Sequence, residues 1–152
     1  MADILKVLAT NRKAYHDYHV EETHEAGIAL TGTEIKSVRV GSVNLRDSFA
    51  QVRNGELWLM NAHIAPYEPA SRQNADPYRD RKLLMHRKEI LRLFGRVREQ
   101  GLTIIPLRLY LKKNRAKVEV GFARGKKQYD KREAISKHDA AREIQRAVKE
   151  RR

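Results

Sequence analysis

The chain has 152 residues with 32 Lys or Arg against 19 Asp or Glu, a formal net charge of +13 that favours a polyanionic partner such as nucleic acid. This length is typical of one domain with its own core, and the lack of cysteine excludes disulfides, thiolate metal sites and thiol nucleophiles. Apolar runs of only a few residues exclude a membrane-spanning helix, so we expect a soluble cytoplasmic protein.

The basic charge is concentrated in the second half of the chain. Residues 1–70 hold 7 basic and 9 acidic side chains, residues 71–110 hold 10 and 4, and residues 111–152 hold 15 and 6. A nearly neutral beginning followed by a basic end is typical of a folded core that carries an interaction tail.

The first elements predicted along the chain are a strand and a short helix. Aromatic and β-branched residues over 15–30 indicate a strand, with a bulge or bend near Gly27. The segment 31–40 then predicts a short helix that ends at Gly41.

A β-hairpin is the clearest local signal in the sequence. Asn54 and Gly55 separate two strand-like segments, 44–53 and 56–64, and this dipeptide suits a type I′ turn because both central residues need a positive φ. The polar, proline-containing segment 65–82 that follows is predicted to be a loop, mobile or functional, with a positive charge.

A basic amphipathic helix is predicted over 83–100, ending at Gly101. Its apolar face is expected to consist of Ile90, Leu91, Phe94 and Val97. Apolar residues then alternate in two further segments, 107–111 and 118–122, which predicts a second hairpin.

Two hairpins and a bent first strand indicate a small antiparallel β structure. The pattern alone leaves a sandwich open, but short strands with interposed helices resemble a Greek-key barrel of the OB type. We therefore expect a mainly β fold with peripheral helices: an OB-type closed antiparallel barrel over residues 1–124, plus a basic C-terminal tail. That tail, residues 125–152, is predicted to be disordered when free and helical when bound, because its apolar stripe is too thin to hold a helix alone.

Histidines and acids are concentrated in one short segment. The ten residues 16–25 contain His16, Asp17, His19, Glu21, Glu22, His24 and Glu25. Alternation along a strand separates these side chains onto two faces, so we expect surface polar residues and neither a metal nor another cofactor. A metal-dependent nuclease that uses His16, Glu21, Glu22 or His24 stays open as an alternative.

Five segments together resemble the SsrA-binding protein (SmpB) family. They occur in the family's order and are NRKAYH at 11–16, EETHEAGIAL at 21–30, GTEIKS at 32–37, DPYRDRKLL at 76–84 and ARGKKQYDKR at 123–132. The resemblance implies a non-catalytic protein that binds the tRNA-like domain of transfer-messenger RNA (tmRNA, SsrA). It also implies delivery of this RNA to stalled ribosomes in bacterial trans-translation, with no membrane and no small-molecule substrate.

The resemblance also assigns roles to individual residues. It implies RNA contacts at Glu25, Leu84 and Lys117, supported by Asn11, Arg12, Lys13, His16 and Lys36. The carboxylate of Glu25 would accept hydrogen bonds from base amino and imino groups, although pairing with a neighbouring cation is an open alternative. Leu84 would pack beneath an unstacked base, although ordinary core packing is open too.

For the tail, the resemblance implies ribosome contacts at the small-subunit decoding centre and in the empty mRNA channel. The residues concerned are Lys126, Lys127, Tyr129, Asp130, Lys131, Arg132, Lys137, Arg142 and Arg146. The basic members would meet phosphates of ribosomal RNA with an affinity that falls as salt rises. A general basic RNA-binding or ribosomal protein is the remaining alternative.

Overall fold

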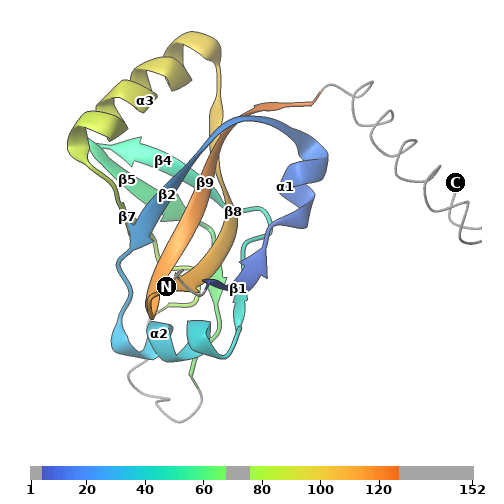
Figure 1. Ribbon diagram of the computed structural model, residues 1–152, viewed down its shortest axis with the longest axis vertical. Coiled ribbons are helices and arrows are strands. Elements are labelled where there is room, and N and C mark those ends of the chain that lie inside the picture. The colour runs from blue at the N-terminus through green and yellow to red at the C-terminus, as the bar shows by residue number, and fades with distance from the viewer. Residues whose placement is uncertain (1–4, 68–75, 127–152) are drawn as a thin grey trace, which may run out of the picture.

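The computed structural model describes residues 5–67 and 76–126, which form a mainly β structure with three helices (Figure 1). In chain order the elements are β1 (Leu5–Thr10), α1 (Arg12–Asp17), β2 (Tyr18–Ile28), α2 (Gly32–Arg39), β3 (Val43–Asn44), β4 (Phe49–Arg53), β5 (Glu56–Met60), β6 (His63–Ile64), β7 (Arg81–Leu84), α3 (Arg87–Gln100), β8 (Thr103–Lys112) and β9 (Arg115–Gly125). No helix in these two ranges is long and apolar enough to cross a membrane.

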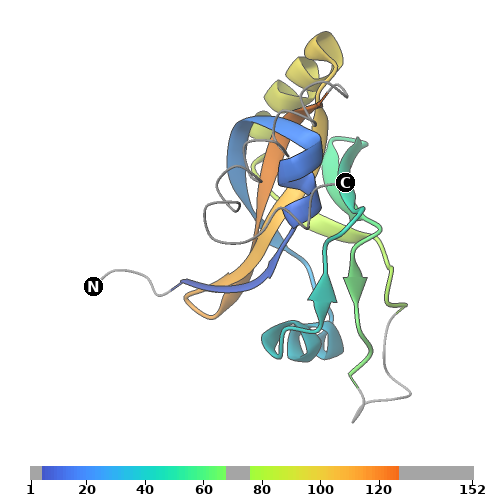
Figure 2. The ribbon, with the colours of Figure 1, turned by 90° about the vertical axis from the view of Figure 1, so that its right-hand side faces the viewer.

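Seven strands form an antiparallel sheet in the order β1-β8-β4-β5-β7-β2-β9. Because β9 also pairs with β8, six of them close into a ring, and β1 is attached to β8 outside it. Strands β3 and β6 form a separate small sheet. The helices lie outside the ring, with α3 at one end of the molecule and α2 at the other (Figures 1 and 2).

The core fills the inside of the ring with the alternating residues predicted for the second hairpin. Leu109, Val118, Val120 and Phe122 are each at most 1% exposed. They meet Leu57 and Leu59 from β5 and the buried side of α3 in one cluster. Leu107, also part of the predicted hairpin, joins a second cluster with Ala14 of α1.

Both predicted hairpins are confirmed. Asn54 and Gly55 have φ values of 52° and 75° and join β4 to β5. Lys113 and Asn114, with φ values of 50° and 65°, make the equivalent turn between β8 and β9. The short helix is also confirmed as α2, which ends shortly before Gly41 at φ 79°.

The beginning of the predicted first strand is helical instead. Asn11 caps α1, because its Oδ1 accepts from the Ala14 N–H at 3.3 Å and its Nδ2 donates to the Pro106 carbonyl at 2.9 Å. Strand β2 therefore starts only at Tyr18. The bulge predicted near Gly27 is wrong: the register with β9 is continuous there, and the irregularity lies earlier in β2.

Three further expectations are corrected between residues 65 and 100. Arg81 and Lys82, predicted to lie in a loop, belong to β7, and Arg81 is 0% exposed. The helix α3 starts at Arg87, since the residues before it pair as a strand. Its buried side includes Leu93, whereas Leu91 is 49% exposed. The predicted tail beyond residue 126 lies outside the described residues.

Candidate RNA interface

Gly27 marks the point where β2 is paired on both sides. On one side Gly27 pairs with Lys117 of β9, and on the other it pairs with Leu84 of β7. Glu25 precedes Gly27 by two residues and so lies on the same face of β2. The structure thus brings together Glu25, Leu84 and Lys117, three residues that are far apart in the sequence.

Leu84 is exposed here and does not join the core. Its side chain is 51% exposed, and its Cβ lies 3.3 Å from the position that a Cβ on Gly27 would occupy. The missing side chain of Gly27 therefore makes room for Leu84 on the surface. Of the two roles open for this leucine, core packing is wrong.

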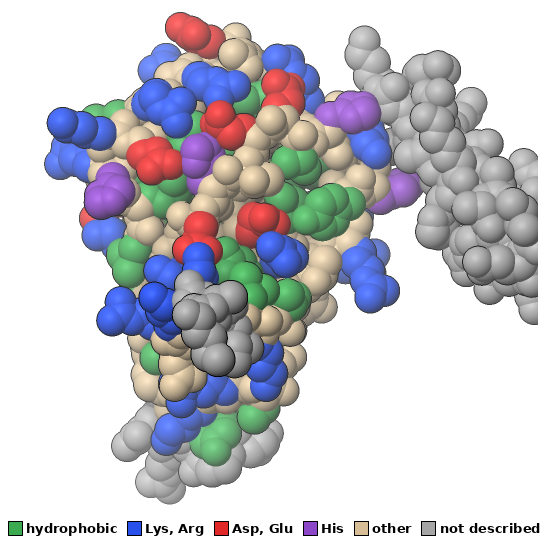
Figure 3. Space-filling model, viewed as in Figure 1, with side chains coloured by type: hydrophobic (Ala, Val, Ile, Leu, Met, Phe, Trp, Pro, Cys, Tyr) green, Lys and Arg blue, Asp and Glu red, His purple; other side chains and the backbone are tan. Residues whose placement is uncertain are grey.

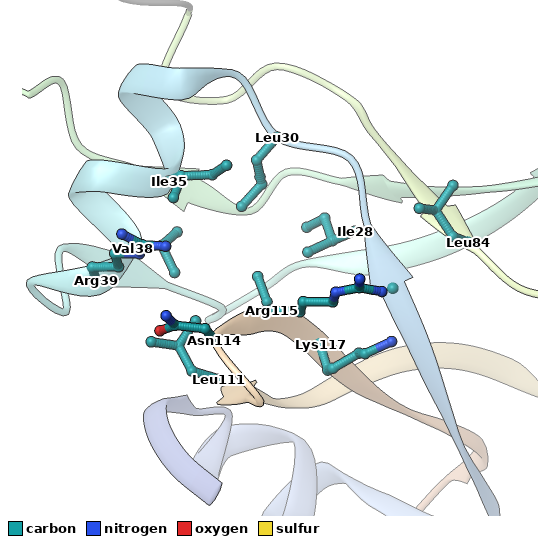
Figure 4. Close-up of a pocket in the computed structure, with 12 residues that line it drawn as sticks. Ile28, Leu30, Ile35, Val38, Arg39, Leu84, Leu111, Asn114, Arg115 and Lys117 are labelled. Carbon is teal, nitrogen blue, oxygen red and sulfur yellow. The ribbon is translucent and has the colours of Figure 1, made fainter.

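A pocket of ≈ 300 Å³ opens beside Leu84 and Lys117 (Figure 4). Its apolar lining includes Ile28 of β2, Leu30 of the connection that follows, and Ile35 and Val38 of α2. Two further cations line it, Arg39 of α2 and Arg115 of β9. An apolar floor with a basic rim suits a base or ribose whose phosphate is held by arginine or lysine.

Glu25 is held by two neighbours through a single oxygen. Its Oε2 accepts from the Tyr110 hydroxyl at 2.5 Å and lies 3.4 Å from Lys112 Nζ. The Tyr110 hydrogen bond, followed by the charges of Lys112 and Lys117, holds the pKa of the Glu25 carboxyl below its ordinary value despite partial desolvation. Within the described residues Oε1 has no hydrogen-bond partner, so an ionised acceptor is left for a ligand.

Tyr110 is a site residue that the sequence reasoning missed. Burial, followed by the hydrogen bond to Glu25, raises the pKa of its hydroxyl, which therefore remains a neutral donor. Arg108 lies over its ring at 5.3 Å and pairs with Glu119 at 3.1 Å. The signal was present in the sequence: Arg108, Tyr110 and Lys112 alternate with the buried leucines of β8.

An ion network around the buried Glu34 joins α2 to β7, two elements that contribute residues to the pocket. The sequence reasoning did not predict this network. Glu34 of α2 accepts from Arg79 at 2.6 Å and from Arg81 at 2.8 Å, which ties α2 to β7. Burial alone would raise the pKa of Glu34, but hydrogen bonds from Arg79, Thr31 and Arg81 outweigh it and hold the pKa below its ordinary value. Arg81 also donates to the Ala62 carbonyl at 2.7 Å.

Four other residues predicted for RNA binding lie at a second place, at the start of α1 or within it. Arg12 and His16 are exposed, and Lys13 pairs with Asp47 at 2.7 Å. Asn11 is only 4% exposed and uses its side chain as the cap described above, so it positions α1. The backbone N–H of Asn11 donates to the Leu107 carbonyl at 2.8 Å, so α1 begins beside β8 and ends where β2 starts.

Two more predicted residues flank these places. Lys36 is exposed on α2 and lies 5.6 Å from the centre of the Tyr67 ring. Lys126 donates from Nζ to the Tyr15 carbonyl at 3.2 Å, which puts it beside α1. The other predicted tail residues, from Lys127 to Arg146, lie outside the described residues.

The histidine-rich segment is organised by ion pairs. His24 bonds to Glu22 at 2.9 Å through Nε2 and to Glu89 of α3 at 2.8 Å through Nδ1. The bulge between Val20 and Glu22 also changes the faces that simple alternation predicts. Within residues 5–67 and 76–126, no three side chains of His, Asp or Glu are grouped as metal ligands.

Comparison with known proteins gives consistent matches. The family model described as "SmpB protein" matches residues 8–150. The chain is 64% identical to the SsrA-binding protein of Carboxydothermus hydrogenoformans over 146 residues, 96% of this chain and 98% of that protein. It is 62% identical to the SsrA-binding protein of Caldicellulosiruptor saccharolyticus over 148 residues, 97% of this chain and 94% of that protein.

A solved structure is similar as well. It is described as "tmRNA-SmpB: a journey to the center of the bacterial ribosome". The two chains are 52% identical with a TM-score of 0.66, and the match covers 83% of this chain and 92% of that chain.

Proposed function

The chain belongs to the SmpB protein family, and from this we propose that the pocket beside Gly27 holds the tRNA-like domain of tmRNA. The protein binds tmRNA and acts with it on the bacterial ribosome in trans-translation. It is an RNA-binding protein and not an enzyme. The proposed delivery to stalled ribosomes places it in the cytoplasm.

The observation that carries this assignment is the convergence of three kinds of group around Gly27. Glu25 offers an ionised oxygen, Leu84 an exposed apolar surface and Lys117 a cation. A folded RNA loop presents the three complementary groups, which are base amino or imino donors, the face of an unstacked base, and phosphate. A plain basic surface would lack the carboxylate and the leucine.

The exposed cations of α1 form a second proposed contact with the same RNA. Arg12, Lys13 and His16 lie on α1, outside the pocket, so one structured RNA would reach both places. Such contacts to phosphates are expected to make binding depend on salt, while the pocket supplies preference for one RNA.

The fold and the tail complete the proposal. We infer that the closed ring of strands is a barrel of the OB type over residues 1–124, in keeping with its antiparallel order. Residues 125–152 are proposed to be the tail that enters the empty mRNA channel and becomes helical there, with Lys126 beside α1 as its starting point.

Exchange of Glu25 for alanine tests the site. Glu25→Ala is expected to weaken binding of the tRNA-like domain by about 10- to 100-fold, the size of a lost base-specific contact. Glu21→Ala is the matched control, because Glu21 is exposed on the same strand and pairs with Arg124 away from the pocket. Equal affinities for the two variants in a titration with labelled RNA would disprove the assignment of the pocket.

A further inference from the structure

The outer face of α3 combines basic side chains with a position that has no side chain. Ile90 and Leu93 are buried on the inner side of the helix. At 100° per residue the opposite arc contains the exposed Lys88, Leu91, Arg92, Gly95, Arg98 and Glu99. These six residues are called the α3 face below, and the upper left of Figure 3, over α3, shows several Lys and Arg side chains with acidic ones among them.

The positive charge of the α3 face is not neutralised within the fold. Glu89 points inward to His24, and Arg96, also on the inner side, pairs with Glu22 at 2.8 Å. Among the described residues, no acidic side chain forms an ion pair with Lys88 or Arg92. Glu99 is the exposed acid at the C-terminal end of the arc. Three cations, Lys88, Arg92 and Arg98, within about 15 Å of helix suit a row of phosphates.

Gly95 lies in the middle of this face, where a glycine is unfavourable. An interior helical glycine is less stable than alanine at the same position, and no atom lies within 4 Å of the place where its Cβ would be. Packing within the described fold therefore does not explain the glycine. A partner backbone that approaches the helix closely between flanking cations does explain it.

The α3 face is directed away from both parts of the proposed tmRNA site. His24 contacts α3, whereas the neighbouring Glu25 lies on the other face of β2. Figure 1 shows α3 and α1 on opposite sides of β2 and β9, and α2 at the lower end of the molecule. One RNA that covers α1 and the pocket leaves the α3 face open for another.

We propose that the α3 face docks on the phosphate backbone of ribosomal RNA, with Gly95 at the point of closest approach. This rests on the proposed function, because it assumes that tmRNA occupies the opposite side of the molecule. Leu91 then packs against ribose or base surface between Lys88 and Arg92. The face adds a ribosome contact to the tail without contributing to tmRNA binding.

Single-charge variants of the full chain test the proposal. Lys88→Gln and Arg92→Gln are each expected to weaken binding to purified bacterial 70S ribosomes about four- to fivefold at 0.15 M salt, and to lower the salt slope by about 1. Lys6→Gln is the control, since it removes one exposed cation from β1. Affinity for a transcript of the tRNA-like domain is expected to stay unchanged in all three variants.

Gly95→Ala separates docking from folding. It is expected to raise the melting temperature by about 3 °C, because alanine favours the helix, while weakening ribosome binding severalfold. Ribosome affinity equal to wild type in Arg92→Gln and Gly95→Ala would overturn the proposal, and so would a parallel loss of affinity for the tRNA-like domain. Ribosome binding is measured with and without the tRNA-like domain. If the wild-type chain shows no preference for the tRNA-like domain over another structured RNA, that result counts against the proposed function alone.

Discussion

Exchange of Tyr110 for phenylalanine removes one hydroxyl and leaves the buried ring in place. This hydroxyl donates to Glu25 Oε2 at 2.5 Å, and hydrogen bonds to charged groups contribute about 1.5–3 kcal/mol. The side chain of Glu25 is 37% exposed, so solvent screening reduces the contribution. We expect Tyr110→Phe to lower the free energy of unfolding by about 1 kcal/mol at neutral pH.

The same variant has a defined pH dependence. The hydroxyl of Tyr110 is the main cause that lowers the pKa of Glu25 in the folded protein. A carboxyl with a lowered folded pKa stabilises the fold above its unfolded pKa of about 4.3, and this contribution is lost as the pH falls through the folded value. The difference in stability between wild type and variant should therefore be full at pH 7 and smaller at about pH 3.

Urea unfolding followed by the fluorescence of Trp58 measures both differences. Affinity for the tRNA-like domain, titrated at pH 7, is expected to fall severalfold in Tyr110→Phe, because the carboxylate loses the bond that orients it. An equal loss of stability at the two pH values would refute the reasoning, since the effect would then not pass through the Glu25 carboxylate.

Three further variants test the supports of the site. Glu34→Gln should lower the free energy of unfolding by about 3–5 kcal/mol in thermal melts, because it leaves the buried Arg81 without its anion. A loss below about 1 kcal/mol would contradict a stabilising role of the ion network. Asn11→Ala should lower the free energy of unfolding by about 1–2 kcal/mol in urea melts, because the helix α1 loses its cap. Weaker RNA binding with unchanged stability would instead indicate that Asn11 contacts the RNA directly. Gly27→Ala should displace Leu84, reduce RNA affinity and lower the free energy of unfolding by about 1 kcal/mol. Unchanged RNA affinity in titrations would show that the position of Leu84 does not matter for RNA binding.

Elements that depend on neighbouring residues were predictable from the sequence. The turn at Asn54 and Gly55 needs positive φ values that these two residue types supply themselves, so the hairpin followed from the dipeptide. The same holds for α2, whose end at Gly41 has a left-handed φ. Alternation indicated the core residues Leu109, Val118, Val120 and Phe122, although parts of β8 and β9 bury both faces because α1 covers the outer one.

Features that depend on distant partners were not predictable in this way. Arg81 resembles a solvated cation in its local sequence, and its burial depends on Glu34, 47 residues earlier. Likewise, α1 is capped by a side chain that also bonds to Pro106, 95 residues later. Periodicity carries no information about such pairs.

The candidate site was predicted in its residues but not in its arrangement. The family resemblance indicated Glu25, Leu84 and Lys117, and the strand register then brought them together around Gly27. The polar alternation in β8 marked Tyr110 as facing outward, but its bond to Glu25 of β2 followed only from the pairing of both strands with β9.

Competition binding of the full wild-type chain would test the proposed function as a whole. The labelled tRNA-like domain of tmRNA competes with an unrelated structured RNA of equal size, at near-physiological salt with magnesium and again at higher salt. The account predicts a preference for the tRNA-like domain that persists as salt rises, because the pocket at Gly27 reads features other than phosphate. Equal binding of both RNAs that collapses together with rising salt would contradict it and leave only a generic polycation.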